Sequence, residues 1–299
     1  MKLKPVISVV MPVFNYGRYI KESIDSVLSQ TFPDFELIIV NDGSTDYSSQ
    51  IAHSYSDKRV RIIDFSENKG CYSARNAGMR TSEGKYICVM DADDVCLPDR
   101  LKNQYRFMEE NPEIGLIGGA LRLFNSFLTN YRETDYETIK LYLLRFCYLC
   151  HPTCMIKSSL IEKYDLYYNE SYRFASDYDW QVRSSSLFPV SNINDNVLLH
   201  RMHDQQITSD KKNDQAIFAN QIRLRQLSFF DILPTENEKE LHLSFIRGAF
   251  NEKFDKEMIE RWIVRLLEGN DRTRYFSHQK LQDFLHAHKY YYFNRKIEV

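Results

Sequence analysis

The chain lacks any long uninterrupted run of hydrophobic residues, although hydrophobic types make up 43% of its 299 residues. A helix that spans a bilayer needs about 20 consecutive apolar residues, so none is predicted here. The apolar stretch near the N-terminus is interrupted by Pro5 and Pro12 and is followed by no small-residue cleavage site. We therefore predict no secretory signal peptide and expect a cytoplasmic protein.

The sequence also lacks an excess of charge of either sign. Its 39 basic and 41 acidic residues give a formal net charge of -2. A nucleic-acid-binding protein normally carries a basic stripe, because contacts to phosphates supply much of its affinity. We therefore expect no nucleic-acid partner. The length and composition indicate a globular protein with one large domain, or one domain with an appended helical part.

Cysteine is sparse, and the six cysteines are spread along a chain without an export signal, which favours reduced thiols over a disulfide framework. One stretch, Cys147 to His151, fits the CxxCH pattern of covalent haem attachment, and Cys154 adds a third thiol nearby. That chemistry requires export and a haem pocket, neither of which the sequence supports. Ordinary, partly buried thiols are the preferred interpretation.

Through about residue 125, short β-rich runs alternate with amphipathic helical segments. Residues 19–28 carry apolar side chains at helical spacing, and Pro98 suits the first turn of a helix that starts near Leu97. This alternation predicts an α/β fold with a mostly parallel sheet flanked by helices. The predicted strands are residues 6–11, 35–40, 60–63, 86–90 and 114–117.

The second half of the chain is organised differently. Residues 126–210 are less regular, and from about Asn213 the pattern is helical to the end. No internal repeat or low-complexity linker divides the chain. We therefore predict an α/β catalytic domain at residues 1–212 and a helical C-terminal region at residues 213–299.

Acidic residues gather where the predicted strands end. Asp91, Asp93 and Asp94 directly follow an apolar run, and Asp42 and Asp64 follow two other strands. In open α/β sheets, ligands bind beyond the carboxyl ends of the strands. A cluster of carboxylates at such a place faces water or holds a cation, because the charges repel one another and resist desolvation. The two-residue period of a strand lets residues 91 and 93 reach one ligand together.

Four segments of the chain carry a family resemblance. They are VVMPVFNYGRYIKESIDSVLSQTF, ELIIVNDGSTD, ENKGCYSARNAGMRTSEGKYICVMDADD, and the later pair ASDYDWQVR and HRMHDQQITS, all of which lie within residues 6–209. Their order and spacing resemble the glycosyltransferase family 2 enzymes, which have a GT-A type fold and use nucleotide-diphosphate sugars. The resemblance does not extend to the helical region after Asn213.

The resemblance implies a donor site at the strand ends. Pro12, Val13 and Asn15 would line the nucleotide base and ribose. Asp42 would accept a hydrogen bond from the base, for which a uracil N–H is expected, because a carboxylate only accepts. Arg75 would lie against the nucleotide or diphosphate, where a guanidinium can donate two hydrogen bonds to one group.

The segment Asp91-Ala92-Asp93 matches the family's DxD motif. The resemblance implies that Asp93 binds a divalent cation, Mn²⁺ or Mg²⁺, and that Asp91 contacts the ribose or a metal-bound water. Such hard cations prefer oxygen ligands. His203 matches a position near the diphosphate and is a candidate second metal ligand, whereas His151 matches a position near the acceptor. We expect Asp94 to cap the helix that starts near Leu97.

The resemblance places the general base at Asp177, in a segment that reads as a helix. Asp179 lies four residues before Arg183 and is expected to form a surface ion pair with it. The helical spacing places Asp177 opposite Trp180 and Gln181 rather than opposite a basic residue. The family's usual Glu-Asp pair reads Ser176-Asp177 in this chain, which departs from the pattern.

These features predict an inverting, metal-dependent hexosyl- or N-acetylhexosaminyltransferase. It would move a sugar from a nucleotide diphosphate, with UDP expected, to a hydroxyl of a glycan or lipid-linked acceptor in surface polysaccharide biosynthesis. One alternative is a nucleotide-sugar-binding protein without turnover. Another is a nucleotidyltransferase, although residues 12–17 are not the Gly-rich basic loop that it would need. No GxGxxG follows the first strand, which disfavours a dinucleotide oxidoreductase.

The end of the chain is aromatic and basic. Residues 290–293 read YYYF and lie between Lys289 and Arg295. Such side chains suit a membrane interface, so we hypothesise a peripheral contact with the inner face of the membrane. The alternative is a helix end that packs on its own domain.

Overall fold

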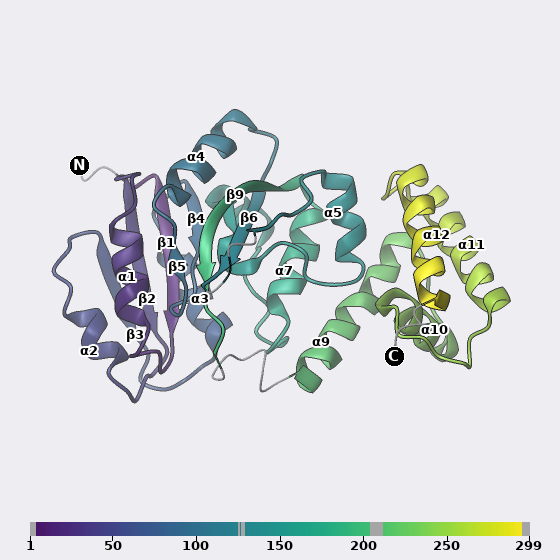
Figure 1. Ribbon diagram of the computed structural model, residues 1–299, viewed down its shortest axis with the longest axis horizontal. Helices are drawn as coiled ribbons and strands as arrows, with labels where there is room; N and C mark the ends of the chain where they lie inside the picture. The colour runs from purple at the N-terminus through teal and green to yellow at the C-terminus, as the bar shows by residue number, and fades with distance from the viewer. Residues whose placement is uncertain (1–3, 125, 127–128, 204–211, 295–299) are drawn as a thin grey trace. The chain divides into compact units, whose positions relative to one another are not determined.

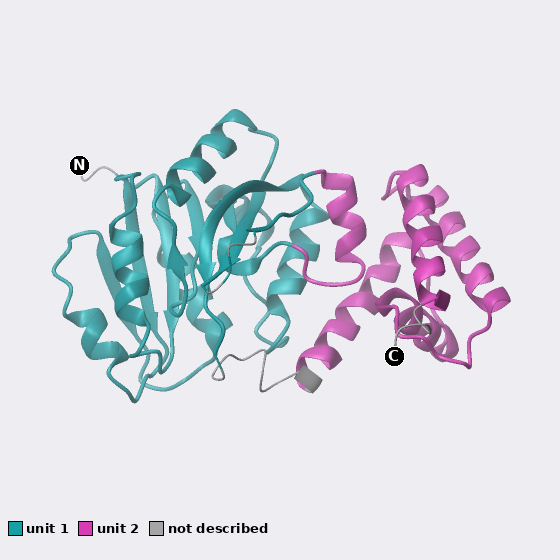
Figure 2. Ribbon diagram, viewed as in Figure 1, with its two compact units in different colours: residues 1–134, 149–211 teal, residues 135–148, 212–299 magenta. Residues whose placement is uncertain are grey.

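The structure is a computed structural model that describes residues 4–124, 126, 129–203 and 212–294. The chain divides into two compact units, residues 1–134 with 149–211 and residues 135–148 with 212–299 (Figure 2). The sequence pattern suggested a division after residue 212 only. Helix α5 (Tyr136–Leu143) instead groups with the C-terminal helices, so the second unit is built from two stretches of the chain.

Within its described residues, the first unit is built on a nine-stranded sheet (Figure 1). Its order is β3-β2-β1-β4-β8-β6-β9-β5, and β7 pairs with β6. β1 is parallel to β2 and β4, and β2 is parallel to β3, whereas β8 is antiparallel to β4 and β6. The predicted mostly parallel sheet is confirmed. The strands are β1 (Ile7–Val13), β2 (Phe35–Asn41), β3 (Val60–Asp64), β4 (Tyr86–Val89), β5 (Val95–Cys96), β6 (Leu116–Leu123), β7 (Thr129–Asn130), β8 (Met155–Lys157) and β9 (Val190–His200).

The central strands are buried over their whole length. Every residue of β1 and β2 is buried, and Val9, Met11 and Leu37 have no exposed surface. A parallel strand covered on both faces needs apolar side chains on both, which explains the continuous hydrophobic runs in the sequence.

Helices cover the sheet of the first unit (Figure 1). On α1, the residues Ile20, Ile24 and Val27 form one buried face. Helix α3 packs closely on β1, because a β-carbon at Gly78 would lie 2.5 Å from a methyl carbon of Val10. The helices are α1 (Ile20–Leu28), α2 (Ser48–His53), α3 (Cys71–Thr81), α4 (Arg100–Glu110), α6 (Ser158–Tyr164) and α7 (Ser176–Ser185), with a 3₁₀ turn η1 (His151–Thr153).

The second unit is helical, as predicted for the C-terminal part. A capping box between Thr235 and Glu238 starts α10, and Gly248 ends it in the left-handed conformation. Phe245, Trp262 and Leu285 belong to its buried core. Besides α5, the elements are α9 (Lys212–Arg225), η2 (Gln226–Phe230), α10 (Glu236–Arg247), α11 (Lys256–Thr273) and α12 (His278–Asn294).

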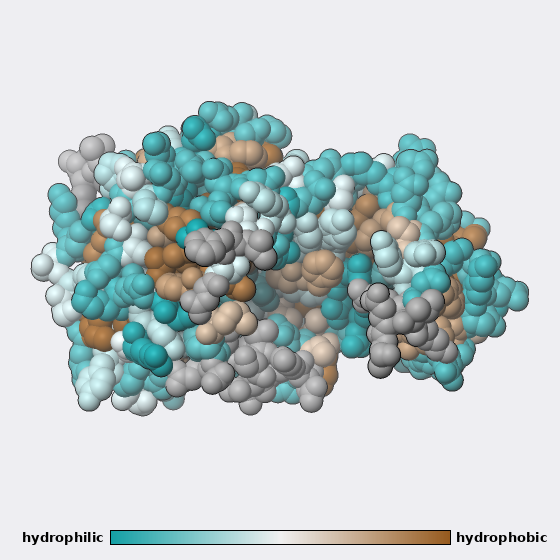
Figure 3. Space-filling model, viewed as in Figure 1, coloured by the Kyte–Doolittle hydropathy of each residue, from teal (hydrophilic) through white to brown (hydrophobic). Residues whose placement is uncertain are grey.

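The aromatic end of α12 is partly buried. Tyr292 is fully buried and shares a hydrogen bond of 2.7 Å with the Ser244 hydroxyl, whereas Tyr290 and Tyr291 are 65% and 59% exposed. Arg295 lies outside the described residues. Hydrophilic residues dominate the visible surface in Figure 3, and no described helix has the length and apolarity that a membrane span needs. The peripheral membrane contact stays a prediction.

Candidate active site

The loops after β1, β2 and β4 meet at one edge of the sheet. Val13 at the end of β1 pairs with Asn41 at the end of β2, and Val10 pairs with Val89 at the end of β4. The carboxyl ends of the three parallel strands therefore lie side by side, which is where α/β sheets bind ligands. The predicted donor-site and metal-site residues that follow these strands are brought together by this register.

Asp42 anchors the loop that precedes α3. Its carboxylate is 1% exposed and accepts hydrogen bonds from the backbone N–H groups of Lys69 (2.7 Å) and Gly70 (2.9 Å). Gly70 has a φ of 96°, a backbone angle that residues with a β-carbon rarely adopt. Burial raises the pKa of Asp42, and the two N–H donors act against that shift. Because a carboxylate oxygen can accept more than one hydrogen bond, Asp42 retains capacity for a ligand N–H.

The end of β1 is shaped by Asn15. Pro12 and Val13 are buried within the strand, and Asn15 follows with a φ of 57°. The Asn15 backbone N–H donates to the Ser44 hydroxyl (3.1 Å), and its side-chain oxygen accepts from the Thr45 N–H (2.8 Å). Asn15 thus holds the loop after β2 against the end of β1. Its contact with a nucleotide stays a prediction.

Arg75 is a buried cation on α3. It is 7% exposed and forms an ion pair with Asp91, whose side chain is 30% exposed. Burial opposes the charged form of Arg75, but the nearby groups that carry or can carry negative charge, Asp91 foremost, together outweigh it and raise the Arg75 pKa. The Arg75 Nε is buried and has no hydrogen-bond partner among the described residues. A buried donor without a partner is costly, and an anionic ligand such as a phosphate oxygen would satisfy it.

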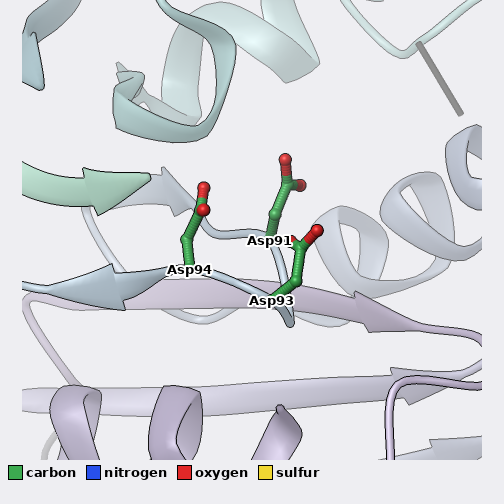
Figure 4. Close-up of side chains that lie close together, drawn as sticks. All are labelled: Asp91, Asp93 and Asp94. Atoms are coloured by element: carbon green, nitrogen blue, oxygen red, sulfur yellow. The ribbon is translucent and has the colours of Figure 1, made fainter. Parts of the chain in front are cut away.

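The three aspartates after β4 form one acidic cluster. One carboxylate oxygen from each of Asp91, Asp93 and Asp94 lies within 4.8 Å of the others. Their carboxyl groups project to the same side of the backbone (Figure 4). Burial and the charges of Asp91 and Asp94 raise the pKa of Asp93 to about 6. The repulsion among these carboxylates and the all-oxygen donor set fit a hard divalent cation.

His203 lies directly beside this cluster. Its Nε2 is 2.9 Å from the Asp93 carboxylate, and its ring stacks on Tyr19 with a centroid distance of 4.8 Å. Its Nδ1 is buried and has no hydrogen-bond partner within the described residues. An imidazole next to Asp93 suits the predicted role of second metal ligand. Residues 204–209, the rest of the matching motif, lie outside the described residues.

The prediction that Asp94 caps a helix is wrong. Helix α4 begins at Arg100 after Asp99, and Asp94 lies too far upstream to cap it. The fully buried Asp94 carboxylate instead accepts from His200 Nδ1 (2.9 Å) and from the Arg201 backbone N–H (3.0 Å). The pairing of β5 with β9 brings these groups together, so Asp94 ties the end of β9 to the acidic cluster.

Arg201 lies in the segment HRMHDQQITS, but the sequence did not indicate a role for it at the site. Its Nε donates to the Asp93 carbonyl oxygen (2.9 Å), and a terminal nitrogen lies 2.5 Å from the Glu22 carboxylate. Its guanidinium also lies 4.0 Å from the ring centroid of Phe124. The local sequence does not reveal these contacts, since they come from α1, the β4–β5 turn and the residue after β6.

A pocket of about 520 Å³ opens beside His203. It is of a size typical for small-ligand sites. Its other lining residues are Arg18, Tyr19, Leu123, Phe124, Ser126, Arg201 and Met202.

Asp177 lies in the first turn of α7 and is partly buried. Its Oδ1 accepts a hydrogen bond of 3.0 Å from the Tyr72 hydroxyl. Tyr72 is on α3, three residues before Arg75. The predicted general base, Asp177, therefore contacts α3, the helix that also carries Arg75, the residue predicted to bind the diphosphate. The helix N-terminus favours a negative charge at this position.

His151 is a buried, neutral histidine. It is 8% exposed, its Nε2 is 3.2 Å from the Tyr168 hydroxyl, and its ring lies edge-on to Trp180. Burial lowers the pKa of His151 well below its usual value. The neighbouring thiols of Cys150 and Cys154 are free, and burial raises the pKa of both. The acceptor contact predicted for His151 stays a prediction.

The expected surface pair between Asp179 and Arg183 is present but is not on the surface. The two side chains are 2.7 Å apart, and Asp179 is 0% exposed while Arg183 is 27% exposed. The sequence spacing indicated the pair correctly, but burial depends on the face of α7 that packs inward with Trp180 and Val182.

We expect Asp179→Asn to lower the free energy of unfolding by about 1–3 kcal/mol, because the substitution weakens a buried, charge-assisted hydrogen bond. Chemical denaturation of the variant and the wild type measures this difference. A variant as stable as the wild type would contradict the assigned role of this pair.

A family model described as glycosyl transferase family 2 matches residues 8–165. An uncharacterized glycosyltransferase of Methanocaldococcus jannaschii is 35% identical over 189 residues, which cover 60% of this chain and 64% of that protein. The O-antigen biosynthesis glycosyltransferase WbnJ of Escherichia coli is 32% identical over 218 residues, covering 69% of this chain and 83% of WbnJ.

Solved glycosyltransferase structures share the fold over nearly the whole chain. Residues 1–349 of Staphylococcus aureus TarS, solved with UDP-GlcNAc, align with a TM-score of 0.66 at 20% identity, covering 97% of this chain and 88% of that one. The mannosyltransferase PcManGT of Pyrobaculum calidifontis, solved with GDP-Man and Mn²⁺, aligns with a TM-score of 0.62 at 15% identity, covering 99% and 89%. At these identities the likeness shows the fold, which confirms the predicted GT-A type architecture.

Proposed function

The chain belongs to glycosyl transferase family 2, and we propose that it is an inverting, metal-dependent enzyme that moves a sugar from a nucleotide diphosphate to an acceptor hydroxyl. The observation that carries this proposal is the arrangement around α3. Arg75 on this helix pairs with Asp91 of the acidic cluster, and Tyr72 on the same helix contacts Asp177. Helix α3 would thereby hold both Arg75, which would bind the diphosphate, and Asp177, which would act as the base.

The donor side is built from groups that complement a nucleotide diphosphate. Asp42 would accept a hydrogen bond from the base, and Arg75 would donate to the diphosphate through its buried Nε. A divalent cation bound by Asp93 and His203 would offset the negative charge of the diphosphate leaving group. Asp91 holds Arg75 in place and adds a carboxylate to the same cluster.

The acceptor side depends on Asp177. As a carboxylate, Asp177 would accept the proton from the acceptor hydroxyl as the oxygen attacks the sugar. A general base contributes about 10²- to 10⁴-fold to a rate, and positioning of the two substrates supplies much of the remainder. Transfer in one displacement inverts the anomeric configuration, because the acceptor attacks from the side opposite the diphosphate.

UDP is the proposed nucleotide, and the transferred sugar is proposed to be a hexose or N-acetylhexosamine. The structural likeness to TarS with UDP-GlcNAc supports a UDP donor. The likeness to PcManGT with GDP-Man and Mn²⁺ supports metal dependence. The similarity to WbnJ, an O-antigen biosynthesis glycosyltransferase, supports a glycan or lipid-linked acceptor and a place in surface polysaccharide biosynthesis.

A donor panel tests the proposed function. The purified chain is incubated with UDP-glucose, UDP-galactose, UDP-GlcNAc and GDP-mannose in the presence of Mn²⁺, with and without short glycans and polyprenyl-linked sugars. We expect acceptor-dependent release of one nucleotide, which mass spectrometry detects together with the extended acceptor. Binding of a donor without release or transfer for any acceptor would favour a nucleotide-sugar-binding protein instead.

A further inference from the structure

Helix α3 carries two residues that contact groups of the proposed site, Tyr72 and Arg75. Tyr72 and Arg75 are three residues apart, so their side chains lie on the same side of the helix. The Arg75 guanidinium lies 5.6 Å from the centroid of the Tyr72 ring. The Tyr72 hydroxyl donates to Asp177 Oδ1 at 3.0 Å. A single helix thus reaches the donor side of the site and the proposed base.

The position of the Tyr72 hydroxyl is set by tight packing. Tyr72 is 8% exposed, and its ring stacks on Tyr168 with a centroid distance of 5.5 Å and an interplanar angle of 28°. Asn76 of α3 holds Tyr168 in place, because its side-chain amide donates to the Tyr168 carbonyl (2.9 Å) and accepts from the Tyr168 N–H (2.8 Å). The hydroxyl therefore has little freedom to turn away from Asp177.

Tyr72 remains a hydrogen-bond donor at neutral pH. Burial raises its pKa well above the usual value for tyrosine, and the negative charge of Asp177 adds to the shift. A donor to a carboxylate favours the ionised form, which is the form that can take a proton.

We propose that Tyr72 is a positioning residue for the base of the transfer reaction. It holds one carboxylate oxygen of Asp177 and so sets the direction in which the carboxylate faces the acceptor. This inference rests on the proposed function, since it takes Asp177 as the base. It also ties the position of the base to the helix that carries Arg75.

The test is Tyr72→Phe, which keeps the buried ring and its stacking but removes the hydroxyl. We expect kcat to fall about ten- to a hundred-fold, as for the loss of one hydrogen bond to a charged group, with the donor KM unchanged. The affinity for UDP or GDP, whichever the donor panel releases, stays the same by calorimetry.

The pH profile separates positioning from a merely structural role. Losing the donor disfavours the ionised carboxylate, so the acidic limb of kcat/KM for the acceptor moves to higher pH. The Asp177 charge also acts on Cys71, Cys154 and Tyr168, and Arg75 acts on Tyr72 itself. All four stay in place in the variant, so the shift reports the lost hydroxyl.

Tyr86→Phe is the matched control. Tyr86 is 1% exposed at the start of β4, and its hydroxyl donates to the Glu109 carboxylate at 2.6 Å. This variant also removes a tyrosine–carboxylate hydrogen bond, but at the opposite end of β4 from the acidic cluster. It is expected to keep the wild-type kcat and pH profile.

Two kinds of failure are distinguishable. If Asp177→Asn is inactive while Tyr72→Phe keeps the wild-type kcat and acidic limb, the inference is overturned and the proposed function stands. If Tyr72→Phe melts at a lower temperature than the wild type but its acidic limb is not shifted, Tyr72 has a structural role and the inference is also overturned. If the wild type transfers no sugar, or Asp177→Asn is fully active, the proposed function fails and the inference fails with it.

Discussion

Asp177→Asn is expected to lower sugar transfer by about 10²- to 10⁴-fold, because the amide keeps the size of the side chain but has no basic oxygen to take a proton. Donor binding is expected to persist, since Asp42, Arg75 and Asp93 are unchanged. Steady-state kinetics with the donor and acceptor identified in the panel measure the first effect. Calorimetry with the corresponding nucleotide measures the second.

Asp179→Asn is the control for this prediction, because it makes the same substitution on the same helix. Its carboxylate pairs with Arg183, which in turn donates to the Tyr167 carbonyl oxygen. The variant is expected to unfold more easily but to transfer sugar normally when folded. An inactive Asp179→Asn together with an active Asp177→Asn would show that the base has been assigned to the wrong residue.

Asp93→Asn is expected to lower transfer by about 10³-fold, the effect of losing several kcal/mol of charge stabilisation. It replaces a buried anionic ligand with a neutral one of nearly the same shape. The wild type should show the same loss when EDTA removes the divalent cation, and Mn²⁺ or Mg²⁺ should restore it. Calorimetry should show that UDP binds more weakly to the chelated protein.

Asp195→Asn serves as the control for Asp93→Asn, since Asp195 is an exposed residue of β9 that accepts a long hydrogen bond of 3.4 Å from Asn103. It should respond to EDTA and Mn²⁺ as the wild type does. Equal UDP affinity of the wild type with and without a divalent cation would argue against metal dependence and against the role of Asp93.

The strands of the parallel half and the start of β6 could be recognised from the sequence, whereas the remaining strands could not. β1, β2 and β4 are short apolar runs because both of their faces are covered. β8 has three residues, and β9 reads VSNINDNVLLH, with four Asn or Asp residues and no apolar run at its start. Pairing of β9 with β6 outweighs its weak local preference for a strand.

The same division applies to the second unit. Its helices were predictable from their periodicity and from end signals such as Thr235 and Gly248. The sequence did not predict that α5 belongs to this unit. Helix α5 is separated from α9 by the whole stretch from β8 to β9, and it groups with the C-terminal helices only through tertiary packing.

The sequence by itself determined the family, the parallel strands and the acidic motif at Asp91 and Asp93, because these depend on neighbouring residues and on the short periods of strand and helix. Only the tertiary structure decided which groups meet at the site. Asp94 and His200, Asp93 and His203, and Tyr72 and Asp177 are 106, 110 and 105 residues apart. Hydrogen bonds over such separations, like the burial of Asp179, arise from the packing of elements that are distant in the sequence. A local sequence pattern cannot predict such packing.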